Sequence, residues 1–197
     1  QVGLNPERMA IANNKLYVTN SGGLNTPLMD STVSIIDLNT QQEIEKITVG
    51  MNPGTIKADP YGDIYVVALG NYSNVPSRMK RINSQTDNVE ETFGADISGI
   101  SLFNNDFLIT YYDFATAQNN VGLFNTNTET IELAEFMPLN EIQTLYGLSY
   151  NPVNNKIYIS DAMGYTNTGY IREYDAQGNY IQSYHVGLNP SKILFYE

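Results

Sequence analysis

The sequence predicts an all-β protein made of four successive blades, each a sheet of four antiparallel strands. Three observations lead to this prediction. A pattern of apolar runs and short turns recurs about every 45 residues, a period typical of β-propeller blades. The runs are rich in Val, Ile, Thr and Tyr, which favour strands. Helical periodicity is not sustained over any helix-sized window of the chain.

The starts of the repeat set the expected blade boundaries. The blocks begin near Pro6, Pro53, Ile97 and Leu145, and the pattern restarts at Pro190. We therefore expect one propeller domain over residues 1–197. Its blades span 5–50, 51–94, 95–139 and 140–187, followed by a closing strand in 188–197.

The first block shows how the strands are assigned. Arg8–Ala12 is a short apolar run, Asn13-Asn14 tolerates the left-handed geometry of a tight turn, and Lys15–Thr19 is rich in strand formers. After a polar loop, Thr32–Leu38 alternates between apolar and polar residues, and a turn leads into Gln42–Val49. We name these strands A, B, C and D. The second block repeats them at 55–58, 63–67, 77–83 and 88–93.

One Asp or Asn residue closes each expected C strand. The four are Asp37, Asn83, Asn125 and Asp175. A short side chain of this kind accepts a hydrogen bond from the main-chain amide two residues later. The pattern predicts tight C–D turns and gives these residues a structural function.

Three segments of the first block carry a family resemblance. Lys15–Asn20 (KLYVTN), Ser31–Asp37 and Ile47–Pro53 resemble the YVTN-type β-propeller repeat, whose letters stand at positions 17–20. The chain is similar to surface-layer proteins and the YncE-like group, and its Asn- and Tyr-rich style resembles Bacteroides-type cell-surface lipoproteins. The resemblance implies a seven-bladed fold outside the cytoplasm, in the periplasm or at the cell surface. It implies no single activity.

The strand count predicts a part of a larger ring. Four A–D sets are followed by a fifth A-like strand, Ser191–Tyr196, and such a strand can complete the first blade and close a ring without an exposed edge. The chain then forms the C-terminal part of a seven-bladed propeller. A compact four-bladed ring and two copies meeting in a ring of eight are the alternatives. Absent blades would uncover apolar faces and favour self-association.

Composition narrows the class of partner. The net charge of −11 repels phosphate backbones, so nucleic acid is not expected as a partner. No apolar run is long enough for a membrane span, although a lipid anchor upstream of Gln1 is compatible with this interpretation. The absence of cysteine excludes disulfides and thiolate metal sites. We expect no cofactor and no metal.

The B–C loops are the expected recognition face, because they are the longest loops of the blades. They span Asn20–Ser31, Leu69–Ser77, Tyr111–Asn120 and Ser160–Gly169. Aromatic rings beside amides and carboxylates suit a glycan or a protein ligand. The candidates are Tyr72, Asn74, Tyr111, Tyr112, Asp113, Phe114, Asp161 and Tyr165. Packing of the loops onto neighbouring blades is the alternative function of these side chains.

The starts of the A strands are a second candidate site, at the mouth of the central channel. This set comprises Glu7, Arg8, Thr55, Asp96, Tyr146 and Lys192. Its basic members could bind an anion and its acidic members a cation. The alternative is that these positions only let the strands converge.

Catalytic motifs are absent from the sequence. It contains no G-x-S-x-G, P-loop or H-E-x-x-H pattern, and its one histidine, His185, falls late in a D strand at the expected outer edge. We therefore expect a non-catalytic binding scaffold. A propeller-type lyase or hydrolase and a purely structural surface-layer component are the other two hypotheses.

Overall fold

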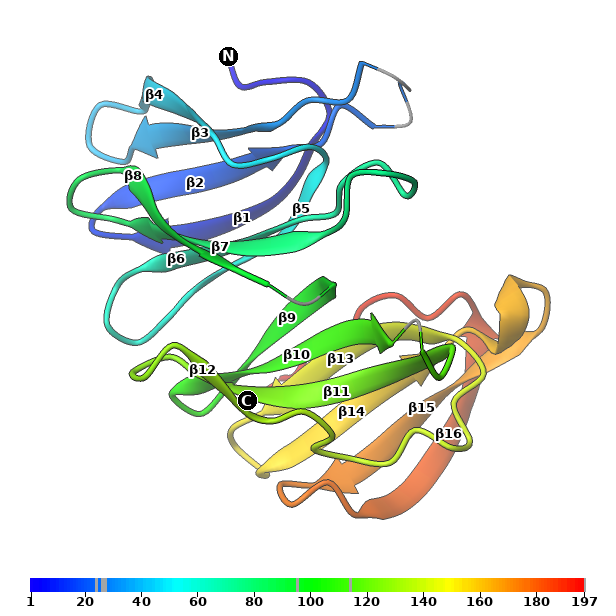
Figure 1. Ribbon diagram of the computed structural model, residues 1–197. Coiled ribbons are helices and arrows are strands. Elements are labelled where there is room, and N and C mark those ends of the chain that lie inside the picture. Colours follow the sequence, from blue (N-terminus) through cyan, green and yellow to red (C-terminus); the bar gives the residue numbers. More distant parts are fainter. Residues whose placement is uncertain (24, 26–27, 95, 114, 197) are drawn as a thin grey trace. The chain divides into compact units, whose positions relative to one another are not determined.

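The computed structural model describes residues 1–23, 25, 28–94, 96–113 and 115–196. Within these residues the chain forms sixteen strands and one short 3-10 helix, and the strands make four antiparallel sheets of four (Figure 1). The all-β prediction is therefore confirmed. The chain divides into two compact units, Gln1–Ile100 and Ser101–Glu197, and each is described by itself.

The first unit contains two sheets whose strands follow one another in chain order. The first sheet has the order β1-β2-β3-β4 and the second the order β5-β6-β7-β8. The strands are β1 (Pro6–Ala12), β2 (Lys15–Asn20), β3 (Thr32–Asp37), β4 (Gln42–Thr48), β5 (Pro53–Ala58), β6 (Ile64–Ala68), β7 (Arg78–Asn83) and β8 (Asn88–Phe93).

The second unit repeats this arrangement, and its first strand begins just before the boundary. Its sheets have the orders β9-β10-β11-β12 and β13-β14-β15-β16. The elements are β9 (Ile97–Phe103), β10 (Asp106–Asp113), β11 (Gln118–Asn125), β12 (Thr130–Leu133), β13 (Leu145–Asn151), β14 (Lys156–Asp161), η1 (Met163–Tyr165), β15 (Thr168–Asp175) and β16 (Tyr180–Leu188). Each sheet falls inside one expected block, except that β16 runs one residue past 187.

The C–D turns form as the sequence predicts. In all four sheets the side chain that closes the C strand accepts a hydrogen bond of 2.9 Å from the amide two residues later. The acceptors are Asp37, Asn83, Asn125 and Asp175. Because these contacts are local in sequence, the turn geometry can be inferred without knowledge of the tertiary structure.

The core of the first unit lies between its two sheets. Tyr17, Val33 and Ile35 of the first sheet pack with Ile56 and Ile64 of the second, and all five are 2% exposed or less. Side chains alternate along a strand, so one face of each sheet supplies this core. Burying an aliphatic side chain of this size contributes roughly 1.5–3 kcal/mol to stability.

The core of the second unit includes a connecting segment as well as strands. Leu108, Val121 and Ile157 pack together with Met137, which lies in the segment 134–144 between β12 and β13. Leu139 and Ile142 of the same segment pack against this cluster. The connecting segment is therefore held by apolar burial although it forms no strand.

The closing strand expected in Ser191–Tyr196 does not form within this chain, and closure of a ring by this segment stays a prediction. Residues 190–196 contain no strand in the structure. A strand needs a neighbouring strand edge for its backbone hydrogen bonds, and no strand of the described chain pairs with this segment. Instead the ring of Phe195 contacts that of Tyr158, with centroids 5.3 Å apart.

Candidate functional site

A cavity of about 280 Å³ in the first unit brings together the two kinds of residue that the sequence singled out. The starts of β1 and β5 contribute Glu7, Arg8 and Thr55, which belong to the predicted channel mouth. The loop after β6 contributes Tyr72, which belongs to the predicted loop face. The remaining lining residues are Ser21, Gly23, Asn52, Gly54 and Leu69.

A repeated Asn-Pro step builds this arrangement. Asn5 and Asn52 precede the first residues of β1 and β5 and have left-handed backbone angles, φ 48° and 57°. Asparagine tolerates this region better than most residues do. The carbonyl oxygen of Asn5 accepts a hydrogen bond from the amide of Ser21, and that of Asn52 accepts one from the amide of Leu69. In both sheets the Asn-Pro step therefore fixes the start of the A strand beside the start of the B–C loop.

The two charged residues of the cavity, Glu7 and Arg8, differ in whether the protein supplies partners for their charged groups. Oε1 of Glu7 accepts hydrogen bonds from Nδ2 of Asn5 at 2.8 Å and from Oγ of Ser21 at 3.0 Å. The guanidinium of Arg8 forms no ion pair with any residue that the structure describes. The guanidinium of Arg8 is thus available to bind an anionic or hydroxyl-bearing ligand.

Tyr72 presents its ring to solvent while its hydroxyl is held. Nδ2 of Asn52 donates a hydrogen bond of 3.1 Å to the tyrosine oxygen, yet the residue is 71% exposed. Its φ of 56° is uncommon for an aromatic residue, and such a conformation persists only where the surrounding structure imposes it. The ring is therefore a fixed apolar surface at the edge of the cavity.

The structure gives several of the other loop residues contacts within their own loops. Asn74 accepts a hydrogen bond from Nδ2 of Asn71 at 2.7 Å. Asp113 accepts hydrogen bonds from the amide of Ala115 and from Oγ1 of Thr116, and its pKa is lowered by these bonds, the amide of Ala115 contributing most. Phe114 lies outside the described residues.

The two tyrosines at the end of β10 have different environments. Tyr111 donates a hydrogen bond to the carbonyl oxygen of Ala134, and burial raises its pKa. Tyr112 is 37% exposed. In the register of the sheet these two residues lie opposite Asn120 and Asn119 of β11.

The other residues of the predicted channel mouth do not line the cavity. Asp96 lies 3.7 Å from Nη1 of Arg78. In the second unit Tyr146 meets Tyr165 of the predicted loop face, edge to face, with ring centroids 5.5 Å apart. Lys192 is exposed.

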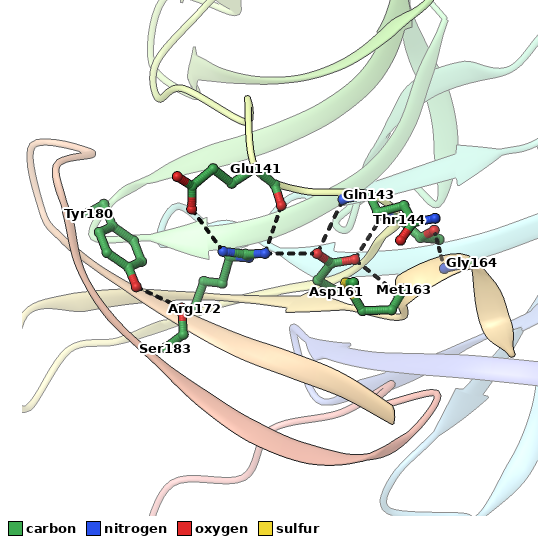
Figure 2. Close-up of polar contacts among 9 residues, drawn as sticks. All are labelled: Glu141, Gln143, Thr144, Asp161, Met163, Gly164, Arg172, Tyr180 and Ser183. Atoms are coloured by element: carbon green, nitrogen blue, oxygen red, sulfur yellow. Dashed lines mark hydrogen bonds and ion pairs between the residues drawn. The ribbon is translucent and has the colours of Figure 1, made fainter. Parts of the chain in front are cut away.

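Asp161 is a fully buried anchor. Its oxygens accept hydrogen bonds from the amides of Gln143, Thr144 and Met163 and from Nη2 of Arg172, as Figure 2 shows. Arg172 also donates to the carbonyl oxygen of Glu141 at 2.7 Å. A carboxylate with this many donors is committed to holding the segment before β13, because its hydrogen-bonding capacity is used within the protein.

Three further observations concern the histidine, metal binding and membranes. His185 lies on β16, an edge strand, where Nε2 is 2.7 Å from Oγ1 of Thr168. Within the described ranges, no three His, Asp or Glu side chains gather as a metal-binding group. None of the described helices has the length and apolar character to cross a bilayer.

Sequence reasoning missed part of the first cavity. Ser21, Gly23, Asn52 and Leu69 were not among the candidates, although Asn52 belongs to the Asn-Pro repeat that was used to align the blocks. The signal was the repeat itself, because the Asn-Pro steps at 5–6 and 52–53 each lie beside the B–C loop of their own sheet.

Comparison with known proteins finds likeness in structure only. No family model matches the chain, and no curated protein sequence does. Three solved structures resemble it over most of its length. The hydrazine synthase of Kuenenia stuttgartiensis matches 93% of this chain and 54% of its own with a TM-score of 0.66 and 16% identity. TolB of Acinetobacter baumannii matches 95% and 45% with a TM-score of 0.62 and 16% identity.

The third similar structure is a quinoprotein alcohol dehydrogenase-like protein from Bacteroides thetaiotaomicron. It matches 91% of this chain and 45% of its own, with a TM-score of 0.61 and 12% identity. All three are propeller-like proteins. The chain has the β-propeller fold. It spans about half the length of these proteins, and identities this low show the fold alone.

Proposed function

We propose that this chain is a non-catalytic binding scaffold that holds a glycan at the cavity of the first unit. The observation that carries the proposal is the convergence of Arg8, Thr55 and Tyr72 on one cavity from three separate segments. A sugar offers an apolar ring face and a rim of hydroxyl groups, and uronic acids add a carboxylate. The exposed ring of Tyr72 can pack against the apolar face of the sugar ring. The guanidinium of Arg8 can bind the hydroxyl groups and the carboxylate.

The structure supports a preformed cavity. Asn52 is 7% exposed and is fixed by a backbone hydrogen bond from its amide to Asp30, and its side chain holds the hydroxyl of Tyr72. Glu7 is held by Asn5 and Ser21. Groups ordered before the ligand arrives lose little further conformational entropy on binding, which favours affinity.

Binding to an array of immobilised neutral and uronic-acid polysaccharides tests the proposal. We expect Arg8→Ala and Tyr72→Ala each to lower affinity about tenfold or more, equivalent to about 1.4 kcal/mol. Tyr61→Ala is the matched control, because Tyr61 is 64% exposed and lies in the turn between β5 and β6, outside the cavity lining. Thermal unfolding of each variant establishes that folding is intact.

Two results would contradict the glycan assignment. One is an array on which the unaltered chain binds nothing. The other is glycan binding that Arg8→Ala and Tyr72→Ala leave unchanged. Binding of a protein that depends on Arg8 and Tyr72 would keep the cavity as the site and replace the glycan by a protein ligand.

The proposal extends to a larger ring outside the cytoplasm. Met9, Ile11 and Ile44 expose 52–67% of their surface on β1 and β4, whereas Ala10, which lies between Met9 and Ile11 on β1, packs against the core. An apolar face of this kind is expected to be covered by a neighbouring blade, and the YVTN-type resemblance suggests seven blades in a periplasmic or cell-surface protein. Fractionation of cells that carry the natural protein, together with a solved structure of it, tests both points.

A further inference from the structure

The second unit contains a larger cavity that belongs to neither set of predicted site residues. Its volume is about 450 Å³, within the range of roughly 300–1,000 Å³ typical of ligand sites. It lies between the beginning of β11 and the connecting segment 134–144. The residues that line it are Ala117, Gln118, Asn119, Asn120, Glu135, Phe136, Met137, Pro138, Leu139, Asn140, Ile142 and Gln143.

The connecting segment is fixed at its beginning, middle and end, so the wall that it forms is rigid. At the beginning, the carbonyl oxygen of Ala134 accepts a hydrogen bond from the hydroxyl of Tyr111. The amide of Phe136 donates a hydrogen bond of 2.7 Å to the carbonyl oxygen of Val121. In the middle, Met137 is 5% exposed and packs in the core.

The end of the segment is fixed by the buried anchor shown in Figure 2. The amides of Gln143 and Thr144 donate to Asp161, and Arg172 donates to the carbonyl oxygen of Glu141. Gly122 allows the opposite wall to come close, because a Cβ there would lie 2.9 Å from the carbonyl oxygen of Leu133. The cavity is therefore preformed, with little ordering left to a ligand.

The polar lining consists mainly of side-chain amides. Gln118, Asn119 and Asn120 come from β11, and Asn140 and Gln143 come from the connecting segment. Among the residues that the structure describes, none forms an intramolecular hydrogen bond with these five side-chain amides. Each amide can both donate and accept, which matches a hydroxyl group that also does both.

Charge and apolar surface narrow the ligand further. Neither lysine nor arginine lines the cavity among the described residues, and Glu135 adds one carboxylate, so an anionic ligand is disfavoured. Leu139 and Ile142 supply apolar surface between the amides. A ligand that is uncharged, rich in hydroxyl groups and apolar on one face fits this lining.

The geometry points to a second carbohydrate site in this cavity, specific for uncharged saccharides. It differs from the first cavity, where the guanidinium of Arg8 can also bind an acidic group. The two sites lie in different units and share no residue.

The test is an NMR titration that follows the side-chain amide resonances of the isotopically labelled chain as an oligosaccharide probe is added. The probes are cellohexaose, maltohexaose, mannohexaose and xylohexaose. We expect at least one of them to shift the amide resonances of Gln118, Asn119 and Asn120. The double variant Asn119→Ala/Asn120→Ala should weaken that binding about tenfold or more, and Asn140→Ala on the other wall should weaken it as well.

Controls separate this inference from the proposed function. Asn127→Ala is the matched control, since Asn127 is an exposed asparagine of the same unit outside the cavity lining. The amide resonances of Gln118, Asn119 and Asn120 report on the second cavity, so they separate its binding from neutral binding at the first cavity. The inference is overturned if all four probes leave these amide resonances in place, or if the variants on either wall show the same Gln118 shift as the unaltered chain. None of these results bears on uronic-acid binding at the first cavity.

Discussion

Tyr17 of the first sheet donates a hydrogen bond from its hydroxyl to Oδ1 of Asp87, 2.5 Å away in the turn between β7 and β8 of the second sheet. Nζ of Lys15 lies 2.5 Å from the other oxygen of the same carboxylate. One acidic residue is therefore held by two residues that stand two positions apart on β2. Burial raises the pKa of Tyr17 strongly, with the bond to Asp87 and nearby acidic charges adding to it, so the hydroxyl stays protonated and donating.

Replacement of Tyr17 by Phe should destabilise the first unit. The ring would remain in the core, but Asp87, which is 8% exposed, would lose a donor. Leaving a buried charged acceptor less satisfied costs about 1–3 kcal/mol. Urea unfolding measures the change, and Tyr61→Phe, at an exposed position, should leave the midpoint unaltered. Equal midpoints for the two variants would show that the contact contributes nothing.

Asp161→Asn should destabilise the second unit far more than Glu141→Gln, although both carboxylates contact Arg172. Asp161 is fully buried, whereas the side chain of Glu141 is 79% exposed. Removing one partner of a buried pair costs roughly 3–5 kcal/mol, and an exposed pair contributes about 0–1 kcal/mol.

Hydrogen exchange adds a local measure of the same prediction. In Asp161→Asn the amides of Gln143 and Thr144 should exchange faster, because they lose a charged acceptor. In Glu141→Gln they should keep the protection of the unaltered chain. Unchanged protection in Asp161→Asn would contradict the anchoring role.

The contact between Lys156 and Glu173 should stabilise the second unit at neutral pH. We expect this contribution to be lost in strong acid and in strong base. The bond from Lys156 lowers the pKa of Glu173 below 4.5, with Tyr184 and Gln182 assisting. The bond to Glu173 raises the pKa of Lys156 above 10.5. Because the pKa of Glu173 is lower in the folded state, its contribution to stability is fully present above pH 4.5 and is lost as the pH falls through the pKa of the folded state. A raised lysine pKa gives stability that is present below 10.5 and lost as pH rises through the folded value.

Unfolding midpoints measured across pH check this pair. Glu173→Gln should lower stability at neutral pH by roughly 1.5–3 kcal/mol, the range for hydrogen bonds to a charged group. It should also flatten the loss of stability in acid, because the group that titrates has been removed. An acid limb that is the same in both proteins would assign the loss to other carboxylates.

Gly122→Ala should weaken the second unit and disturb the second cavity. The added methyl group would lie 2.9 Å from the carbonyl oxygen of Leu133 and 3.2 Å from that of Ala134, which are backbone atoms. Overpacking of this kind costs about 1–3 kcal/mol. Gly187→Ala is the control, because nothing lies within 4 Å of its added methyl group. Thermal unfolding should separate the two variants, and equal melting temperatures would show that the wall yields freely.

Local features of this fold were open to prediction, and features that join distant segments were not. The turn acceptor Asp37 could be inferred because its partner Asn39 is two residues away. The hydrogen-bond partner of Tyr72 could not be inferred, because Asn52 precedes Tyr72 by twenty residues and lies at the start of another strand. The position of Asp161 at the end of β14 predicts a place on the loop face, and only its partners at 143, 144 and 172 show that it is an anchor.

The sequence by itself determined the four sheets, their strand order and the tight turns between strands C and D, because period-two alternation and Asx turns act between near neighbours. Tertiary structure alone decided that Arg8 and Tyr72 meet at one cavity, that the connecting segment 134–144 walls a second, and that residues 191–196 form no strand. Each of these outcomes depends on which segments come together in space. A contact between segments far apart in the chain leaves no periodic signal in either of them.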